Sequence, residues 1–278
     1  MASDHYAVFG HPISHSKSPH IHALFAAQTQ QELIYTAQDV PPACFEVAVK
    51  AFRAGGGQGL NLTVPLKELG SQLAQELSSR ARLAGAVNTL YWQGDRLVGD
   101  NTDGVGLIRD LTLNLKLTLA GRRILILGAG GAARGILGPL LEQTPALLTV
   151  ANRTLARAQE LAARFADLGK ISVASFAELT GQHFDLIVNA TSASLHGELP
   201  PLPDDLLAEG GCCYDLMYAD TPTAFVRWGI EHGAALSTDG LGMLVEQAAE
   251  AFFLWRRVRP ETAQVIRQLR AGASEKIL

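Results

Sequence analysis

A glycine-rich turn between a short apolar strand and a helix constrains the fold of this chain more than any other feature. Residues 123–127 read Arg-Ile-Leu-Ile-Leu, typical of a strand buried in a parallel sheet, and Gly-Ala-Gly-Gly-Ala-Ala follows directly. Gly128, Gly130 and Ala133 fit the pattern G-x-G-x-x-A. The first glycine permits a tight turn, the second lets the backbone approach a pyrophosphate, and the small third residue lets the helix pack on the strand. Because a helix start also offers free N–H groups to an anion, the turn predicts a dinucleotide site.

The residues after the next expected strand, 148–151, indicate which dinucleotide is bound. An NAD-binding unit usually places an Asp or Glu there to hold the ribose 2′-hydroxyl. This chain has no acid at that point; it has Asn152, Arg153, Thr154 and Arg157. Two guanidiniums and a hydroxyl at a helix start suit a 2′-phosphate, so we predict NADP. A solvated helix start with two surface arginines is the alternative.

Apolar runs alternate with segments of helical period along most of the chain, which predicts an α/β protein with parallel sheet. The length of 278 residues suggests about two domains. In the first third of the chain we expect a hairpin over 86–99 and helices over 19–28, 44–54 and 67–80. Ser18 is expected to be the N-cap of the first of these helices. Further strands are expected at 6–9, 33–36, 59–64, 171–173, 185–188, 212–216 and 235–236, and further helices at 132–142 and 154–165.

The C-terminal segment has a different character. Its apolar residues recur at helical spacing over 241–257, and another helix is expected over 260–270. Such helices cannot complete a nucleotide-binding sheet. We therefore expect them to pack back on the first unit and make that domain discontinuous.

Composition and charge exclude several classes of protein. The formal net charge of −4 gives no case for nucleic-acid binding, and no apolar run approaches the ~18 residues of a membrane span. The N-terminus lacks the features of a signal peptide. The three cysteines have no zinc-ligand spacing, and we expect no metal. A cytoplasmic, reduced protein is the expectation, with the choice between monomer and homodimer open.

Polar residues gather where strands of the first unit should end. They form the runs Ser-His-Ser-Lys-Ser-Pro from 14, Asn-Leu-Thr-Val-Pro-Leu-Lys from 61, Ala-Val-Asn-Thr from 86, and Gly-Asp-Asn-Thr-Asp-Gly from 99. Open α/β sheets bind ligands outside the carboxyl ends of their strands. Hydroxyls and amides there suit a small polyhydroxylated substrate, and a lysine beside an aspartate suits proton transfer at an alcohol oxygen. Taken singly, each run is also compatible with capping or turn formation.

These runs, with Asn-Arg-Thr at 152–154 and Asp-Gly-Leu-Gly-Met-Leu-Val-Glu-Gln-Ala at 239–248, resemble the shikimate dehydrogenase family in the same order over nearly the whole chain. The resemblance implies two α/β domains around a cleft: a substrate-binding domain of residues 1–103 plus 240–278, and a Rossmann-like NADP-binding domain of residues 104–239. It implies reversible, NADPH-dependent reduction of 3-dehydroshikimate to shikimate in aromatic amino-acid biosynthesis. Two cofactor-side loops, 190–194 and 219–224, depart from the family's pattern.

The resemblance also implies roles for individual residues. Lys67 and Asp103 match the catalytic pair. The groups that match the substrate site are Ser16, Ser18 and Tyr218 for the carboxylate, and Asn61, Thr63, Asn88 and Gln247 for the ring hydroxyls. The groups that match the cofactor site are Gly128, Ala129, Gly130, Gly131, Ala132, Asn152, Arg153, Thr154, Arg157, Met217 and Gly240.

Two alternatives stay open at this point. A quinate/shikimate dehydrogenase with relaxed NAD and NADP use would need an acid near Asn152, which is absent. A catalytically inactive NADP-sensing protein could keep the glycine turn and lose the polar pair, but Lys67 and Asp103 are both present.

Overall fold

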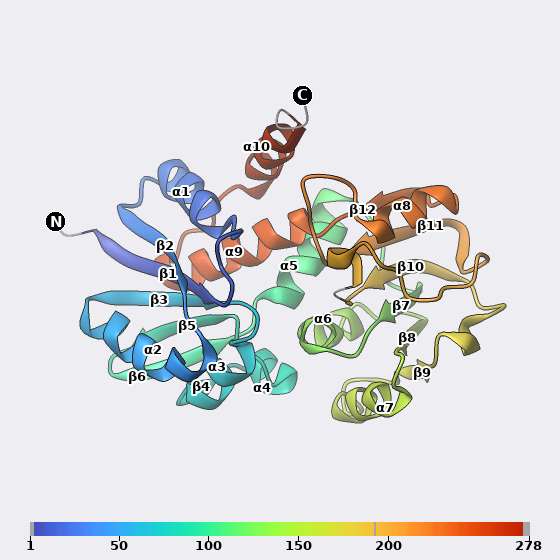
Figure 1. Cartoon of the computed structure of the whole chain (residues 1–278), viewed down its shortest axis with the longest axis horizontal. Helices are drawn as coiled ribbons and strands as arrows, with labels where there is room; N and C mark the ends of the chain where they lie inside the picture. Colours follow the sequence, from blue (N-terminus) through green and yellow to red (C-terminus); the bar gives the residue numbers. More distant parts are fainter. Residues whose placement is uncertain (1–2, 192, 275–278) are drawn as a thin grey trace. The chain divides into compact units, whose positions relative to one another are not determined.

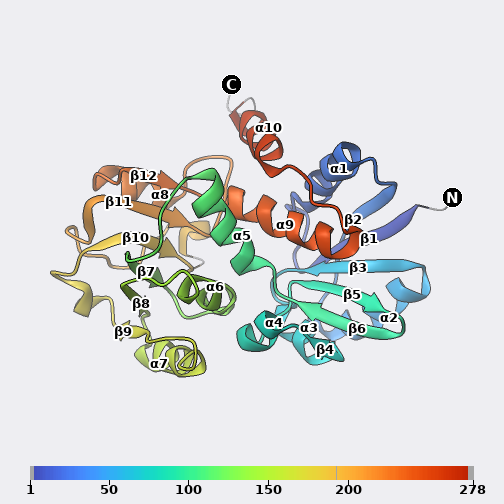
Figure 2. The same ribbon diagram turned by 180° about the vertical axis from the view of Figure 1, so that it is seen from behind.

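The computed structural model describes residues 3–191 and 193–274, and the chain forms two compact α/β units. Unit 1 consists of Met1–Gly106 and Val245–Gln268, so it is discontinuous in sequence. Unit 2 consists of Leu107–Leu244 and Leu269–Leu278. Figures 1 and 2 show the chain from opposite sides, with the N-terminal elements in blue and the C-terminal helices in red.

Unit 1 contains a mixed sheet with the strand order β2-β1-β3-β5-β6-β4. β1 is parallel to β2 and β3, while β5 runs antiparallel to both β3 and β6. The expected hairpin is confirmed, with Gly94 at a φ of +61° in its turn. The strands are β1 (Asp4–Gly10), β2 (Leu33–Asp39), β3 (Gly57–Leu62), β4 (Glu76–Leu77), β5 (Thr89–Gln93) and β6 (Arg96–Asp100).

Helices cover both faces of this sheet (Figure 1). On one face, α2 (Phe45–Ala54) and α3 (Lys67–Leu73) pack through Val49 and Leu69 on strand residues such as Phe9 and Leu60. On the other face, α1 (Ser18–Thr29) and α9 (Leu241–Arg256) meet in an aromatic cluster. The cluster contains Tyr6, His22, Phe25, Tyr35, Phe252 and Trp255.

The expected single helix over 67–80 is wrong, because an edge strand interrupts it. After α3, Glu76 and Leu77 pair with Val98 and Gly99 as β4. Ser78 then caps a new helix, α4 (Ser79–Ala84), by accepting a hydrogen bond from the Ala81 N–H. Sheet pairing with a strand farther along the chain outweighs the local helical pattern here.

Unit 2 contains an all-parallel sheet with the strand order β12-β11-β10-β7-β8-β9. If the strands of this unit are numbered 1 to 6 from β7 to β12, their order from the β9 edge is 3-2-1-4-5-6, which is the strand order of dinucleotide-binding folds. The chain changes direction across the sheet between β7 and β10, which are strands 1 and 4. The strands are β7 (Arg123–Leu127), β8 (Leu147–Ala151), β9 (Ser172–Ala174), β10 (Phe184–Asn189), β11 (Leu207–Asp215) and β12 (Leu236–Thr238).

The helices of unit 2 include two for which the sequence analysis assigned no element. α5 (Asp103–Arg109) begins in unit 1, enters unit 2 and continues as a π-helical segment, Asp110–Asn114. α8 (Ala224–Glu231) packs Phe225 and Trp228 on the sheet. The expected helices are α6 (Gly131–Leu141) and α7 (Leu155–Arg164), and α10 (Thr262–Ser274) ends the described chain. In the described part of the chain, no helix is long and apolar enough to cross a membrane.

Candidate active site

Lys67 and Asp103 form an ion pair in unit 1. Lys67 is the first residue of α3, and Asp103 is the first residue of α5. The Lys67 Nζ donates to Asp103 Oδ2 at 2.6 Å. The Lys67 side chain is 26% exposed and that of Asp103 is 9% exposed. The ammonium therefore stays accessible to a ligand while its counter-ion is largely withdrawn from water.

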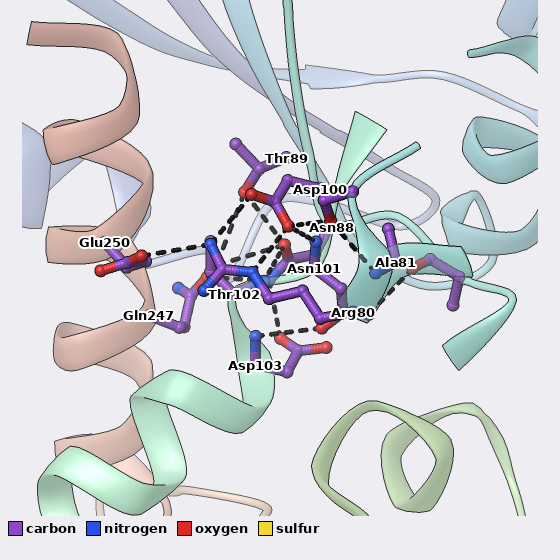
Figure 3. Close-up of polar contacts among 12 residues, drawn as sticks. Arg80, Ala81, Asn88, Thr89, Asp100, Asn101, Thr102, Asp103, Gln247 and Glu250 are labelled. Atoms are coloured by element: carbon purple, nitrogen blue, oxygen red, sulfur yellow. Dashed lines mark hydrogen bonds and ion pairs between the residues drawn. The ribbon is translucent and has the colours of Figure 1, made fainter. Parts of the chain in front are cut away.

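Asn88 holds Asp103 from the other side (Figure 3). Its Nδ2 donates to Asp103 Oδ1 at 2.8 Å and lies 3.2 Å from Gln247 Oε1. Its Oδ1 accepts a hydrogen bond from the Thr102 N–H at 2.8 Å. Three segments that are distant in sequence therefore meet at one amide, and both Asp103 oxygens have a donor.

A second charged group supports the same loop (Figure 3). Arg80 donates to both oxygens of Asp100, at 2.7 and 2.9 Å, and to Glu250 Oε1 at 3.1 Å. Asp100 lies three residues before Asp103, and Glu250 lies three residues after Gln247. One guanidinium thus ties the strand end that leads to Asp103 to the helix that carries Gln247.

Asn61 lies at the end of β3, next to Asn88. Its Nδ2 donates to the Asn88 carbonyl and to Thr89 Oγ1, both at 3.1 Å. Its Oδ1 accepts from the Tyr35 hydroxyl at 2.7 Å. The sequence analysis missed Tyr35, because a tyrosine in a strand looks like an ordinary sheet residue.

Ser18 is a helical residue of α1, so its assignment as N-cap is wrong. Lys17 occupies the cap position, and the Ser18 N–H donates to Ser16 Oγ at 3.3 Å. Ser18 is also a polar neighbour of the Tyr35 hydroxyl, which donates to Asn61, so the two predicted carboxylate-binding serines lie near Asn61. Thr63 is held by its backbone: its N–H donates to Phe9 at 2.9 Å and its carbonyl accepts from Leu66 at 2.8 Å.

In unit 2, the glycine turn lies directly after β7, at the point where the strand order reverses. Gly128 has a φ of +101°, and its N–H donates to the Ala151 carbonyl at 2.7 Å. A Cβ at Gly130 would meet no atom within 4 Å, so this backbone is open to a ligand. After Ala129 and Gly130, α6 begins with Gly131 and Ala132. These features fit a pyrophosphate at the helix start.

The predicted phosphate clamp lies between β8 and α7. The Asn152 side chain makes a local hydrogen bond, in which its Nδ2 donates to the Thr154 carbonyl at 2.8 Å. Thr154 is the N-cap residue of α7, with no hydrogen bond from its own side chain to the helix. Arg153 and Arg157 are exposed beside it. The sequence analysis also missed Arg134. Its side chain extends toward the start of α6, where Nη2 lies 3.7 Å from the position that a Cβ on Gly131 would take. These positive groups and the absent acid fit the 2′-phosphate of NADP.

Met217 and Gly240 are brought together at the end of β11. The Gly240 N–H donates to the Met217 carbonyl at 3.0 Å, and a Cβ at Gly240 would overlap the Leu216 carbonyl. Tyr218 follows, half-buried, and burial raises the pKa of its hydroxyl.

Asp215 holds the loop that follows β11 through buried hydrogen bonds. It is fully buried and accepts hydrogen bonds from Thr223 Oγ1 at 2.6 Å and from Asn189 Nδ2 and the Met217 N–H, each at 3.1 Å. Asn189 also donates to Ser194 in the loop 190–194, of which Ser192 lies outside the described residues. Burial raises the pKa of Asp215, and the hydrogen bonds oppose that rise. The sequence analysis placed Asp215 only in a strand.

The geometry defines a class of protein. A parallel sheet with a glycine turn at its switch point, in one unit, and a lysine–aspartate pair among amides and hydroxyls, in the other, are typical of nicotinamide-dependent dehydrogenases that act on polar alcohols.

Comparisons with known proteins narrow the class to one family. Family profiles match residues 8–90 (shikimate dehydrogenase substrate binding domain), 111–196 (shikimate / quinate 5-dehydrogenase) and 240–270 (shikimate 5′-dehydrogenase C-terminal domain). The chain belongs to the shikimate dehydrogenase family. It is 64% identical over 269 residues to the shikimate dehydrogenase (NADP(+)) of Methylococcus capsulatus, covering 96% of each chain.

Solved structures agree with this assignment. An Ael1 enzyme from Pseudomonas putida superimposes with a TM-score of 0.91 at 48% identity, covering 96% of this chain and 98% of that one. The shikimate 5-dehydrogenase of Thermus thermophilus, in complex with NADP(H) and shikimate, superimposes with a TM-score of 0.86 at 34% identity, covering 97% of this chain and 99% of that one.

Proposed function

We propose that this chain catalyses the reversible, NADPH-dependent reduction of 3-dehydroshikimate to shikimate in aromatic amino-acid biosynthesis. The observation that carries the proposal is the Lys67–Asp103 pair, oriented by Asn88, in a chain of this family. NADPH, when bound, supplies the hydride for the ketone carbon.

Lys67 acts at the oxygen of the reacting carbonyl. Negative charge grows on that oxygen during the reduction, and an ammonium donor stabilises the charge and provides a proton. Asp103 keeps the ammonium oriented through its Oδ2, while its Oδ1 is held by Asn88. In the reverse direction the pair removes the proton from the alcohol.

The remaining residues of unit 1 recognise the substrate. We assign the carboxylate to Ser16, Ser18 and Tyr218, and the ring hydroxyls to Asn61, Thr63, Asn88 and Gln247. We propose a substrate-binding domain of residues 1–103 plus 240–278 and an NADP-binding domain of residues 104–239. The contacts of Asn61 and Asn88 with each other support a single polar site.

For the cofactor, we assign the pyrophosphate to the turn from Gly128 to Ala132 and the nicotinamide to the backbone of Met217 and Gly240. The 2′-phosphate is assigned to Asn152, Arg153, Thr154 and Arg157. We also propose a cytoplasmic location, which the free thiols of the three cysteines support.

One assay tests the function. Absorbance of the reduced nicotinamide is followed with shikimate or quinate, each with NADP or NAD. Turnover of shikimate with NADP far above the other combinations is expected. Equal use of NAD and NADP with both substrates would favour a quinate/shikimate dehydrogenase, and NADP binding without turnover would favour an inactive sensing protein.

A further inference from the structure

Tyr35 connects two parts of the candidate substrate site that the sequence does not link. It lies on β2, and its hydroxyl donates to Asn61 Oδ1 at 2.7 Å. Ser18, on α1, is a polar neighbour of the same hydroxyl. Tyr35 therefore stands between a residue assigned to the substrate carboxylate and a residue assigned to a ring hydroxyl.

The hydrogen bonds of Asn61 fix the orientation of its carboxamide. Both hydrogens of its amide are directed inward, to the Asn88 carbonyl and to Thr89 Oγ1. A backbone carbonyl can only accept, so the reverse orientation of the amide would place two acceptors against each other. The Tyr35 hydroxyl donates to Oδ1 at 2.7 Å, and the buried His22 is a further polar neighbour of the same residue. The Asn61 carboxamide is therefore held in one orientation.

The Tyr35 hydroxyl is held in place and stays protonated. Its ring stacks on His22, with centroids 4.0 Å apart and an interplanar angle of 5°. His22 is itself fully buried beside Phe25 and Phe252. Burial raises the pKa of Tyr35 well above its ordinary value, so the phenol remains a hydrogen-bond donor at neutral pH.

We propose that Tyr35 is a positioning residue that holds the Asn61 carboxamide in the orientation that binds the substrate. The inference rests on the proposed function, because it takes Asn61 to face a ring hydroxyl of shikimate. Tyr35 itself does no chemistry.

Tyr35→Phe tests this, because it keeps the ring stack on His22 and removes only the hydroxyl. The KM for shikimate is expected to rise about 3- to 10-fold, the effect of one hydrogen bond, while kcat and the KM for NADP stay within about twofold. Tyr91→Phe, on β5 and outside this network, is the matched control and should match the unmutated protein. Thermal melts of both variants show whether the fold is kept.

A double-mutant cycle decides whether Tyr35 acts through Asn61. In an Asn61→Ala background, Tyr35→Phe should not change the KM for shikimate further. An unchanged KM in Tyr35→Phe alone, or an equal increase with and without Asn61, overturns the inference and leaves the proposed function intact. If the unmutated protein does not oxidise shikimate with NADP, the proposed function fails, and the inference fails with it.

Discussion

At the scale of single residues, the chemistry that we propose depends on the arrangement of the Lys67 ammonium and the Asp103 carboxylate. Asp103 accepts from Lys67 and Asn88 at separate oxygens, so its carboxylate is oriented by two donors. Lys67 keeps a quarter of its side chain exposed, with donors left for a substrate oxygen. In the mechanism that we propose, the pair places a cation at the reacting alcohol oxygen.

Lys67→Ala is expected to lower kcat by about 10²–10⁴-fold with little change in the KM for shikimate, the usual effect of removing a positioned acid–base group. Steady-state kinetics in both directions measure it. Lys50→Ala, which removes an exposed lysine paired with Glu46, is the control and should behave like the unmutated enzyme. A kcat within a few-fold of normal would remove Lys67 from the mechanism.

His22 makes the stability of the protein depend on pH. Burial lowers the pKa of its imidazole to about 3 in the folded state, from an ordinary value of 6.5. Between these values the unfolded chain binds a proton that the folded chain does not. Stability is therefore lost as the pH falls below about 6.5, by about 1.4 kcal/mol per pH unit for one proton. His22→Phe should flatten the pH dependence of the unfolding free energy by that amount.

Denaturant unfolding at several pH values between about 4 and 6.5 measures this slope. Phe25→Leu weakens the same aromatic cluster but keeps His22, so that variant should be less stable at each pH with the slope retained. If His22→Phe keeps the full slope, another group causes the acid sensitivity.

At the scale of elements, the start of α9 is held by a buried acid. Asp110, in the π-helical segment, accepts hydrogen bonds from the Tyr214 hydroxyl at 2.7 Å and from Asn114 at 2.9 Å. The Met243 N–H donates to the same Tyr214 oxygen at 3.2 Å. Gly242 lies against the Asp110 carboxylate, and a Cβ there would overlap it. The glycine in the Asp-Gly-Leu-Gly run is therefore required by this close approach.

Gly242→Ala is expected to destabilise the protein by about 1–3 kcal/mol, because the helix or the acid must move. Gly272→Ala is the matched control: it lies on α10 with nothing within 4 Å of its Cβ position, and helix propensity predicts a gain of up to about 1 kcal/mol. Melting temperatures of the two variants should move in opposite directions. Equal shifts would show that the space around Asp110 can adapt.

At the scale of the whole molecule, charge is unevenly distributed. The segment from Lys116 to Lys170 has eight basic and three acidic residues in a chain whose formal net charge is −4. This segment contains the glycine turn and the arginines at the start of α7. Such a distribution attracts a cofactor that carries an additional phosphate.

We expect kcat/KM for NADP to exceed that for NAD by about 10²–10⁴-fold, from two charge-assisted contacts, and the KM for NADP to rise with salt. Asn152→Asp combined with Arg153→Ala should shift the preference toward NAD. Lys170→Ala, which removes a positive charge after the other end of α7, should not. Equal kcat/KM for the two cofactors in the unmutated protein would contradict the assignment of Arg153 and Arg157.

The sequence by itself determined the features that depend on neighbouring residues. The turn at Gly128 could be predicted because a positive φ favours glycine and because a strand and a helix flank it. The NADP preference followed from the missing acid near Asn152, and relatives named as NADP(+) enzymes support it. The C-terminal helix from Leu241 was predicted from its apolar spacing.

Only the tertiary structure decided which distant residues meet. Asn88 and Gln247 are 159 residues apart, and their contact depends on how α9 lies on the sheet of unit 1. The bond from Tyr35 to Asn61 requires β1 to lie between β2 and β3, and the strand at Glu76 forms because β6 provides an edge to pair with. Local propensity contains no information about such partners, because their energy arises only when the chain topology brings the groups together.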